Sequence, residues 1–231
     1  PPLNYSGNTN AAVVSASNAS VLVGNVFGSG DTAAAVAGFS SAEAQAAPVS
    51  DGGLVVHARR LSRSARGILA QLEQPLAAFV VDDVQPCGSG SVRVSGTLND
   101  TTGTGTLTVE YRNCRDGDET TNGQGTFQVD AIDPGTLTPT VFTISFTRLQ
   151  FRGTGVSRDV GGSLRVQLDI PTASETLTQN LVGLNNLSGA MTKSENLVLF
   201  NDYDNLFNPT SIDSTVNGRL YDGVHGYVDV T

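Results

Sequence analysis

The chain has 231 residues, 15% of them charged, and its formal net charge is −9. This length allows one large domain with its own hydrophobic core. The acidic balance argues against nucleic-acid binding, which depends on clustered Lys and Arg. No apolar run approaches the ~18 residues of a membrane-spanning helix. We therefore expect no nucleic-acid partner and no transmembrane segment.

Residues 1–50 predict an apolar N-terminal extension and linker, because they carry only two charged side chains, Asp31 and Glu43. Within them, the uncharged and proline-free segment 11–26 is compatible either with a short strand followed by a helix or with one long strand. It either packs on its own core or adds as a strand to the sheet of a neighbouring copy. The apolar side chains of this predicted assembly segment are Val13, Val14, Val21, Leu22, Val23 and Val26.

Residues 51–79 predict an amphipathic helix. Apolar side chains recur at steps of three and four from Leu54 to Leu76. Asp51 and Pro75 stand near the expected start and end of this helix. The opposite face is basic, and it either is solvated or docks against an acidic surface of this protein or of a neighbouring copy. Its basic residues are Arg59, Arg60, Arg63 and Arg66.

Residues 80–231 predict an antiparallel β domain. Segments of this region alternate apolar and polar side chains with a period of two, most regularly at 163–170, and turn residues separate them. The alternation in 140–151 slips at Thr147-Arg148, which predicts a bulge or a bend. About nine short strands at such spacing favour a mostly antiparallel β-sandwich or barrel.

The only two cysteines, Cys87 and Cys114, bracket a predicted hairpin within this β domain. If the two cysteines lie opposite each other, Val92 faces Val109 and the chain reverses at residues 99–102. Cys87 has the wrong parity for the apolar face, so either Gly88–Gly90 holds a bulge or the bridge sits on the other face. We expect a disulfide, which points to an oxidising compartment.

The motifs of common enzyme classes are missing from the sequence. It contains neither a G-x-S-x-G nucleophile elbow nor a P-loop, and it has no dinucleotide-binding glycine fingerprint. Its two histidines, His57 and His225, are far apart, and both cysteines are assigned to the bridge, which leaves a zinc site poorly supplied. We therefore expect a protein that is not an enzyme.

Two Asp-rich segments are the candidates for metal binding. One contains Asp116 and Asp118, and the other contains Asp202 and Asp204. Alternating carboxylates supply the oxygen ligands that calcium prefers, although the spacing of an EF-hand is absent. Each segment is either an ordinary solvated turn or a calcium site, and we expect no cofactor other than calcium.

Three short segments carry a resemblance to known proteins. They are the passages 217–230 and 4–9, and the opening Cys87-Gly-Ser-Gly90 that precedes strands rich in Gly-Thr pairs. They resemble segments of secreted, β-rich proteins of Gram-negative bacteria. The resemblance implies an extracellular or cell-surface location in the bacterial envelope, and it transfers no catalytic residue.

Together these observations favour a non-enzymatic, extracellular structural or assembly protein. In this hypothesis the protein is a filament subunit whose N-terminal segment is donated to the next copy, so that its partners are other copies of itself or envelope proteins. The alternative is a secreted binding module that holds a carbohydrate, a lipid or a calcium-dependent partner.

Overall fold

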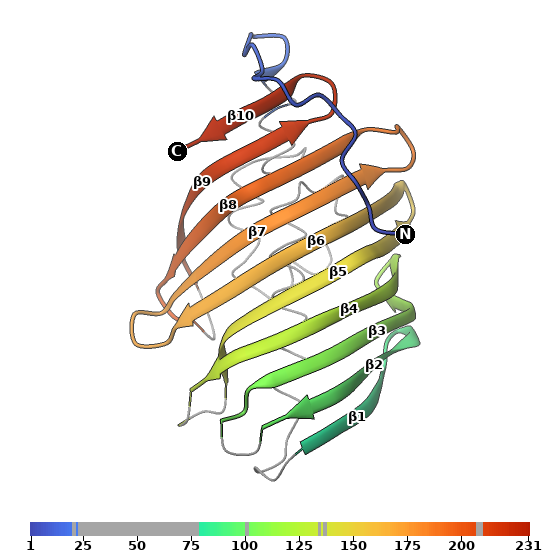
Figure 1. The fold of residues 1–231 in the computed structure, drawn as a ribbon, viewed down its shortest axis with the longest axis vertical. Coiled ribbons are helices and arrows are strands. Elements are labelled where there is room, and N and C mark those ends of the chain that lie inside the picture. Colours follow the sequence, from blue (N-terminus) through green and yellow to red (C-terminus); the bar gives the residue numbers. More distant parts are fainter. Residues whose placement is uncertain (20–21, 23–78, 100–101, 134, 136–137, 207–209) are drawn as a thin grey trace.

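The computed structural model describes residues 1–19, 22, 79–99, 102–133, 135, 138–206 and 210–231. Most of these residues form one antiparallel sheet of ten strands, in which each strand pairs with its neighbours in the sequence (Figure 1). The strands are β1 (Phe79–Pro86), β2 (Ser89–Leu98), β3 (Gly105–Asp116), β4 (Glu119–Ile132), β5 (Pro139–Gly153), β6 (Val156–Asp169), β7 (Ser174–Asn185), β8 (Met191–Tyr203), β9 (Ile212–Asp222) and β10 (Gly226–Val230).

The mostly β, antiparallel class is confirmed, but the expected sandwich or barrel is wrong. The described strands form a single open sheet, with β1 at one edge and β10 at the other. The error has a physical reason: a period of two shows that a strand has one buried face, and it says nothing about how a sheet closes or what covers it. The predicted amphipathic helix spans residues 51–79. Residues 51–78, which include its four arginines, lie outside the described part of the chain, and Phe79 begins β1.

The two faces of the sheet differ in chemistry. We call the face that carries the buried apolar side chains the inner face, and the opposite face the outer face. Phe142, Leu164 and Leu177 are examples of inner-face residues with almost no exposed surface. Outer-face positions on the same strands are mostly polar, as are Thr143 and Arg165. This division is what alternation along each strand requires.

Of the two alternatives predicted at Thr147-Arg148, a bulge or a bend, the structure contains the bulge. The pairing of β5 with β6 shifts between Phe146 and Leu149, so both of these apolar side chains are buried in the core. The two residues between them absorb the change of parity.

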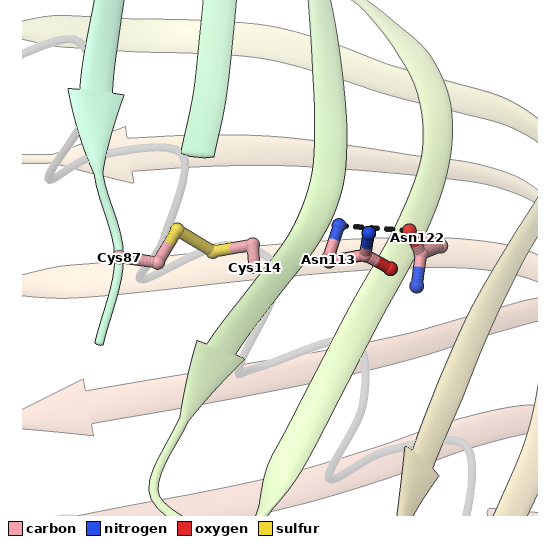
Figure 2. Close-up of a disulfide and its surroundings, with 4 residues drawn as sticks. All are labelled: Cys87, Asn113, Cys114 and Asn122. Atoms are coloured by element: carbon pink, nitrogen blue, oxygen red, sulfur yellow. Dashed lines mark hydrogen bonds between the residues drawn. A yellow bond between two sulfur atoms is a disulfide. The ribbon is translucent and has the colours of Figure 1, made fainter. Parts of the chain in front are cut away.

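The disulfide between Cys87 and Cys114 is present, with 5.3 Å between the two Cα atoms (Figure 2). Cys87 lies in the turn between β1 and β2, and the bridge ties this turn directly to β3. Of the two alternatives for Cys87, the bulge is present, because the register of β2 against β3 shifts between Ser89 and Ser91. Gly90, with φ of 73°, occupies the bulge, where a side chain would collide with the carbonyl groups of β3.

The expected register of this hairpin is wrong by two residues. Val109 faces Val94 rather than Val92, and the reversal runs from Asn99 to Thr104, where the Asn99 N–H donates to the Thr104 carbonyl at 2.7 Å. Apolar side chains face one another in either register, so the hydrophobic pattern does not distinguish the two. Cys87 lies outside β2, and its position therefore does not set the pairing of the strands.

The first residues of the chain cross the outer face, from β5 to the β10 edge (Figure 1). The Leu3 N–H donates to the Thr147 carbonyl at 3.2 Å, and Ala11 forms a parallel bridge with Tyr227. We call residues 3–12 the strap. Beyond it, the N–H groups of Ala19 and Leu22 each donate to a carbonyl four residues earlier, so a helical turn follows the strap.

Candidate binding site on the inner face of the sheet

The candidate site lies in a row of side chains that crosses six strands of the inner face. The register of β3 to β8 places these residues side by side, and each has at most 3% of its surface exposed. Five of the six are apolar, as expected for a buried row in a sheet. The row consists of Leu107, Phe127, Ile144, Leu164, Gln179 and Leu197.

Gln179 is the exception in this row. Leu164 and Leu197 face it from the neighbouring strands, and Leu177 and Leu181 flank it on the same face of β7. Its side chain is 2% exposed, and neither its Nε2 nor its Oε1 atom has a hydrogen-bond partner in the described part of the chain. Burying a polar group without a partner costs about 1–3 kcal/mol. Gln179 is therefore a polar group for which the described fold provides no partner.

A second polar group lies further along β7, and it is hydrogen-bonded. Glu175 is buried, and its Oε2 atom accepts hydrogen bonds from Asn201 Nδ2 at 3.1 Å and from the Tyr203 hydroxyl at 2.8 Å. The Ser214 hydroxyl donates to Asn201 Oδ1 at 2.8 Å. This cluster links β7, β8 and β9. It lies four residues from Gln179, which is about 13 Å along a strand.

Ser194 shows how another buried polar group on this face is paired. The register of β7 against β8 shifts between Gln179 and Val182, and the shift leaves the N–H of Leu181 without a ladder partner. The Ser194 hydroxyl, itself buried, accepts a hydrogen bond from this N–H at 3.0 Å. The side chain thus completes the hydrogen bonding that the bulge disrupts.

The outer face contains a buried ion cluster around Asp159. Its carboxylate is fully buried and accepts hydrogen bonds from Arg148, from Arg152 Nη2 at 2.6 Å and from Asn186 Nδ2 at 3.0 Å. Burial alone would raise the pKa of Asp159, but the hydrogen bonds from Arg152, Arg148 and Asn186 outweigh it and hold this pKa below its ordinary value. Because every partner belongs to the fold, we assign this cluster a structural role.

The strap is anchored to the outer face by an aromatic cluster. The ring of Tyr221 lies 5.6 Å from the rings of both Tyr5 and Tyr227. The Tyr5 hydroxyl donates to the carbonyl groups of Asn8 and Asp222 at 2.9 and 3.1 Å. Burial, together with the nearby Asp222 and Tyr221, raises the pKa of Tyr5 to about 12.

Charged side chains surround these tyrosines. Lys193 Nζ lies 4.6 Å from the centre of the Tyr221 ring, and the guanidinium of Arg219 lies 3.8 Å from that of Tyr227. The Tyr221 hydroxyl donates to Glu195 Oε2 at 2.5 Å. These contacts are typical of cation–aromatic packing at a half-exposed surface, and they fix β8, β9 and β10 beneath the strap.

His225 is the one histidine that the described residues contain, and it supports a turn. Asp222 Oδ1 accepts hydrogen bonds from the backbone N–H groups of Val224 and His225, and it lies 2.7 Å from His225 Nδ1. Burial would raise the pKa of Asp222, but the hydrogen bonds from His225 and Val224 outweigh it and lower this pKa. The pair holds the β9–β10 turn, whose Gly223 carbonyl accepts a hydrogen bond from the Asn8 N–H of the strap at 2.9 Å.

The predicted calcium residues lie in separate places. Asp118 is largely exposed and pairs with Arg115 at 3.5 Å, and Asp116 is the last residue of β3. Asp202 is exposed on β8, where it faces Asp213 of β9. The described residues contain no group of three or more His, Cys, Asp or Glu side chains placed to hold a metal ion. Calcium binding stays a prediction.

Asp204 holds a turn through hydrogen bonds to its carboxylate. It accepts from the N–H groups of Thr210 and Ser211 at 2.9 and 3.0 Å, and from the Thr210 hydroxyl. The hydrogen bond from the Thr210 side chain, followed by those from the Ser211 and Thr210 backbone, lowers the pKa of Asp204 to about 2. A calcium ion would compete with these donors for the same oxygens.

The predicted assembly segment is described only in part. Val13 and Val14 are 86% and 61% exposed, whereas Leu22 is 3% exposed. Val21, Val23 and Val26 lie outside the described residues. The beginning of the segment binds its own sheet, because the Ala12 N–H donates to the Tyr227 carbonyl at 2.7 Å and the Tyr227 N–H donates to the Asn10 carbonyl at 2.8 Å. Donation to another copy stays a prediction.

The sequence does contain a signal that marks Gln179, although it was not among the predicted site residues. Leu177, Gln179 and Leu181 share one parity, so a polar residue interrupts an apolar alternation. In an exposed strand, the same interruption would not indicate a functional residue. Only the register, which places two further leucines beside Gln179, shows that this position is surrounded by apolar side chains.

No protein-family model, no curated protein and no solved structure matches this chain. None of the helical residues that the structure describes belongs to a helix long and apolar enough to cross a membrane.

Proposed function

We propose that this protein is a non-enzymatic, secreted binding module for a lipid-like molecule. The observation that carries the proposal is the unpartnered amide of Gln179 within the apolar row. A row of leucines would pack equally well without the cost of a buried polar group. A ligand with a polar group that reaches this amide would supply the missing partner.

Three further observations support the secreted and non-enzymatic parts of the proposal. The disulfide is typical of oxidising compartments, and the low charge content suits a secreted β-protein. The resemblance to secreted proteins of Gram-negative bacteria gives the same location. The carboxylates of Glu175 and Asp159 are hydrogen-bonded within the fold, which suits a scaffold better than an acid–base pair.

Binding of a neutral, environment-sensitive dye tests this function. We expect N-phenyl-1-naphthylamine to increase its fluorescence on binding to the delipidated protein and to saturate at one site per chain. Palmitic acid and palmitamide should displace it. The chain contains no tryptophan, so intrinsic fluorescence will not obscure the signal. Absence of saturable dye binding, with no lipid retained in native mass spectra of freshly purified protein, would reject the proposal.

A second candidate function is self-assembly by exchange of the strap between copies, in the manner of the filament hypothesis. The strap favours it because residues 10–12 already add to the edge strand β10, and the same contacts would form with a strap from another copy. Electron microscopy of the concentrated full chain tests this candidate. Polymers that disappear on deletion of residues 1–12 would support it, and discrete monomers would reject it.

A further inference from the structure

Two neighbouring turns at one end of the sheet each expose a large aliphatic side chain. Leu187, in the turn between β7 and β8, is 66% exposed, and Val224, in the turn between β9 and β10, is 73% exposed. We infer that these two turns insert Leu187 and Val224 into the surface of a lipid bilayer. Such a contact goes beyond the proposed function, because a protein can rest on a bilayer without holding a single lipid molecule.

The two turns are built alike. Asn185 Oδ1 accepts a hydrogen bond from the Leu187 N–H at 2.9 Å, and Asp222 Oδ1 accepts one from the Val224 N–H at 3.0 Å. In each turn the N–H of the following residue also donates to the same oxygen, at 3.3 and 2.8 Å. The side chain of an Asn or Asp thus fixes the backbone of the aliphatic residue two positions later. Both aliphatic side chains are therefore presented by ordered turns.

The turns also lie side by side, at the same end of the sheet (Figure 1). The Gly223 N–H of one turn donates to the Met191 carbonyl at the end of the other at 2.8 Å. The Asn186 N–H ties the first turn to the Ser157 carbonyl of β6 at 2.7 Å, and the Asn8 N–H of the strap ties the second. Two strand spacings, about 10 Å, separate the two hairpins. Leu187 and Val224 are therefore placed to meet one surface together.

Charge is distributed unequally between the two ends of the sheet. Arg158 and Lys193 lie beside the β7–β8 turn, and the carboxylates that contact the two turns, those of Asp159 and Asp222, are buried. The opposite end is strongly acidic. Carboxylates are repelled by lipid phosphate groups and are costly to remove from water, so the acidic end points away from a membrane. The carboxylates at or beside the opposite turns are those of Asp130, Asp133, Asp169, Asp202, Asp204 and Asp213.

A bilayer fits this arrangement better than a protein partner does. A specific protein interface buries about 800 Å² on each partner, and two side chains on separate turns supply only a small part of that area. The interfacial region of a bilayer takes up apolar side chains without requiring a complementary shape. The polar residues Ser188 and His225, which follow the two aliphatic residues, would remain among the lipid head groups.

Flotation with lipid vesicles tests the inference. The full chain is mixed with vesicles of phosphatidylcholine, which carry no net charge, and is separated on a density gradient. We expect the wild type to float with the vesicles at low and at high salt, because apolar transfer is not screened by ions. Leu187→Asn and Val224→Thr approximately keep the size of each side chain and remove its apolar character. Each should weaken binding about tenfold, and the double variant should not float.

Val84→Thr is the matched control. Val84 is 58% exposed, but it lies on the edge strand β1 and not in a turn, so this change should leave binding intact. A second measurement reports insertion directly. The chain contains no tryptophan, so Leu187→Trp, Val224→Trp and Val84→Trp each introduce a single fluorophore. Brominated phosphatidylcholine should quench the first two variants and not the third.

Three results would overturn the inference. They are a wild type that does not float with the vesicles, equal flotation of the wild type and a double variant whose melting curve is unchanged, and no quenching at either turn. Self-association that the double variant loses, without vesicle binding, would show instead that the turns contact a second copy. Failure of the proposed function is a separate result, because it appears as absent dye binding and leaves flotation unchanged.

Discussion

Asp159 is a fully buried carboxylate that remains ionised because the fold supplies cations for it. Arg148 and Arg152 come from the end of β5, where the bulge at residues 147–148 brings them to the outer face beside β6. Breaking a buried pair of this kind costs about 3–5 kcal/mol, since it leaves uncompensated charge. The local sequence predicted a change at residues 147–148, but it did not predict that this change brings two arginines to Asp159.

We therefore predict that Asp159→Asn lowers the free energy of unfolding by about 3 kcal/mol at neutral pH. The pKa of Asp159 is lowered in the folded state, so its contribution is present above the ordinary Asp pKa and is lost as the pH falls through the lowered value. Urea unfolding between pH 7 and pH 2 should show a steeper acid loss in the wild type than in the variant. Asp169→Asn, at an exposed site on the same strand, is the control. Parallel pH profiles of wild type and Asp159→Asn would contradict the prediction.

Glycines at the β10 edge show why the strap can lie so close to the sheet. Gly226 has φ of 98°, and a side chain there would collide with the Asn10 carbonyl of the strap. Gly7 and Gly223 approach each other in the same region, where a Cβ on Gly7 would lie against the Cα of Gly223. In the sequence, glycines of this kind indicate only turns. Their role in holding the strap is visible only in the structure, where the strap lies against the β9–β10 turn.

Gly226→Ala should loosen the strap. We expect a loss of stability greater than the roughly 1–2 kcal/mol that a left-handed backbone alone costs a non-glycine residue. We also expect faster proteolytic cleavage near residue 12. Gly189→Ala is a closely matched control, because Gly189 has φ of 75° but open space around the position of a side chain. Equal losses of stability and equal cleavage rates in the two variants would show that the strap contact contributes nothing.

At the scale of the element, the sequence predicted the strands well and their arrangement less well. Period-two alternation predicted strands within β5 and β6, and the slip at Thr147-Arg148 predicted a change there, because both follow from which side chains face the core. The register of the hairpin depends instead on a bulge at Gly90 and on the reversal from Asn99 to Thr104, where the pattern allows two solutions. Closure of the sheet and the unpaired Gln179 depend on contacts between strands, which a single strand does not encode.

The disulfide stabilises one end of the first three strands. It closes a segment with a separation of 27 residues, and the chain-entropy relation gives a contribution of about 3–4 kcal/mol. The double variant Cys87→Ser, Cys114→Ser should lose that amount in urea unfolding. It should keep the bulge, because the Gly88 N–H still donates to the Arg115 carbonyl. Two alkylatable thiols in the unreduced wild-type protein, detected by mass spectrometry, would contradict the bridge itself.

At the scale of the whole molecule, the two edges of the open sheet are treated differently. The strap covers part of β10, whereas β1 carries the exposed residues Asp82, Asp83 and Pro86. Charged residues and proline on an edge strand discourage pairing with another chain. Both devices limit edge-to-edge association of this sheet, which bears directly on the filament hypothesis.

Removal of the charge and the proline from β1 should promote association. We predict that Asp83→Thr combined with Pro86→Val increases the apparent mass in light scattering as the protein concentration rises, since the edge then resembles an ordinary strand. Asp202→Thr, on the interior strand β8, removes the same charge at a residue that has a strand paired on each side. A double variant that stays monomeric at the highest concentration would show that these residues do not protect the edge.

The order of the strands also determines the order in which the chain can fold. Because every strand pairs with the one made just before it, the sheet can grow one hairpin at a time as the chain emerges. The strap is the exception, since residues 3–12 must wait for β10, which follows all the other strands of the sheet in the sequence. Docking of the strap therefore follows formation of the sheet, and protection of the strap from protease reports that β10 is in place.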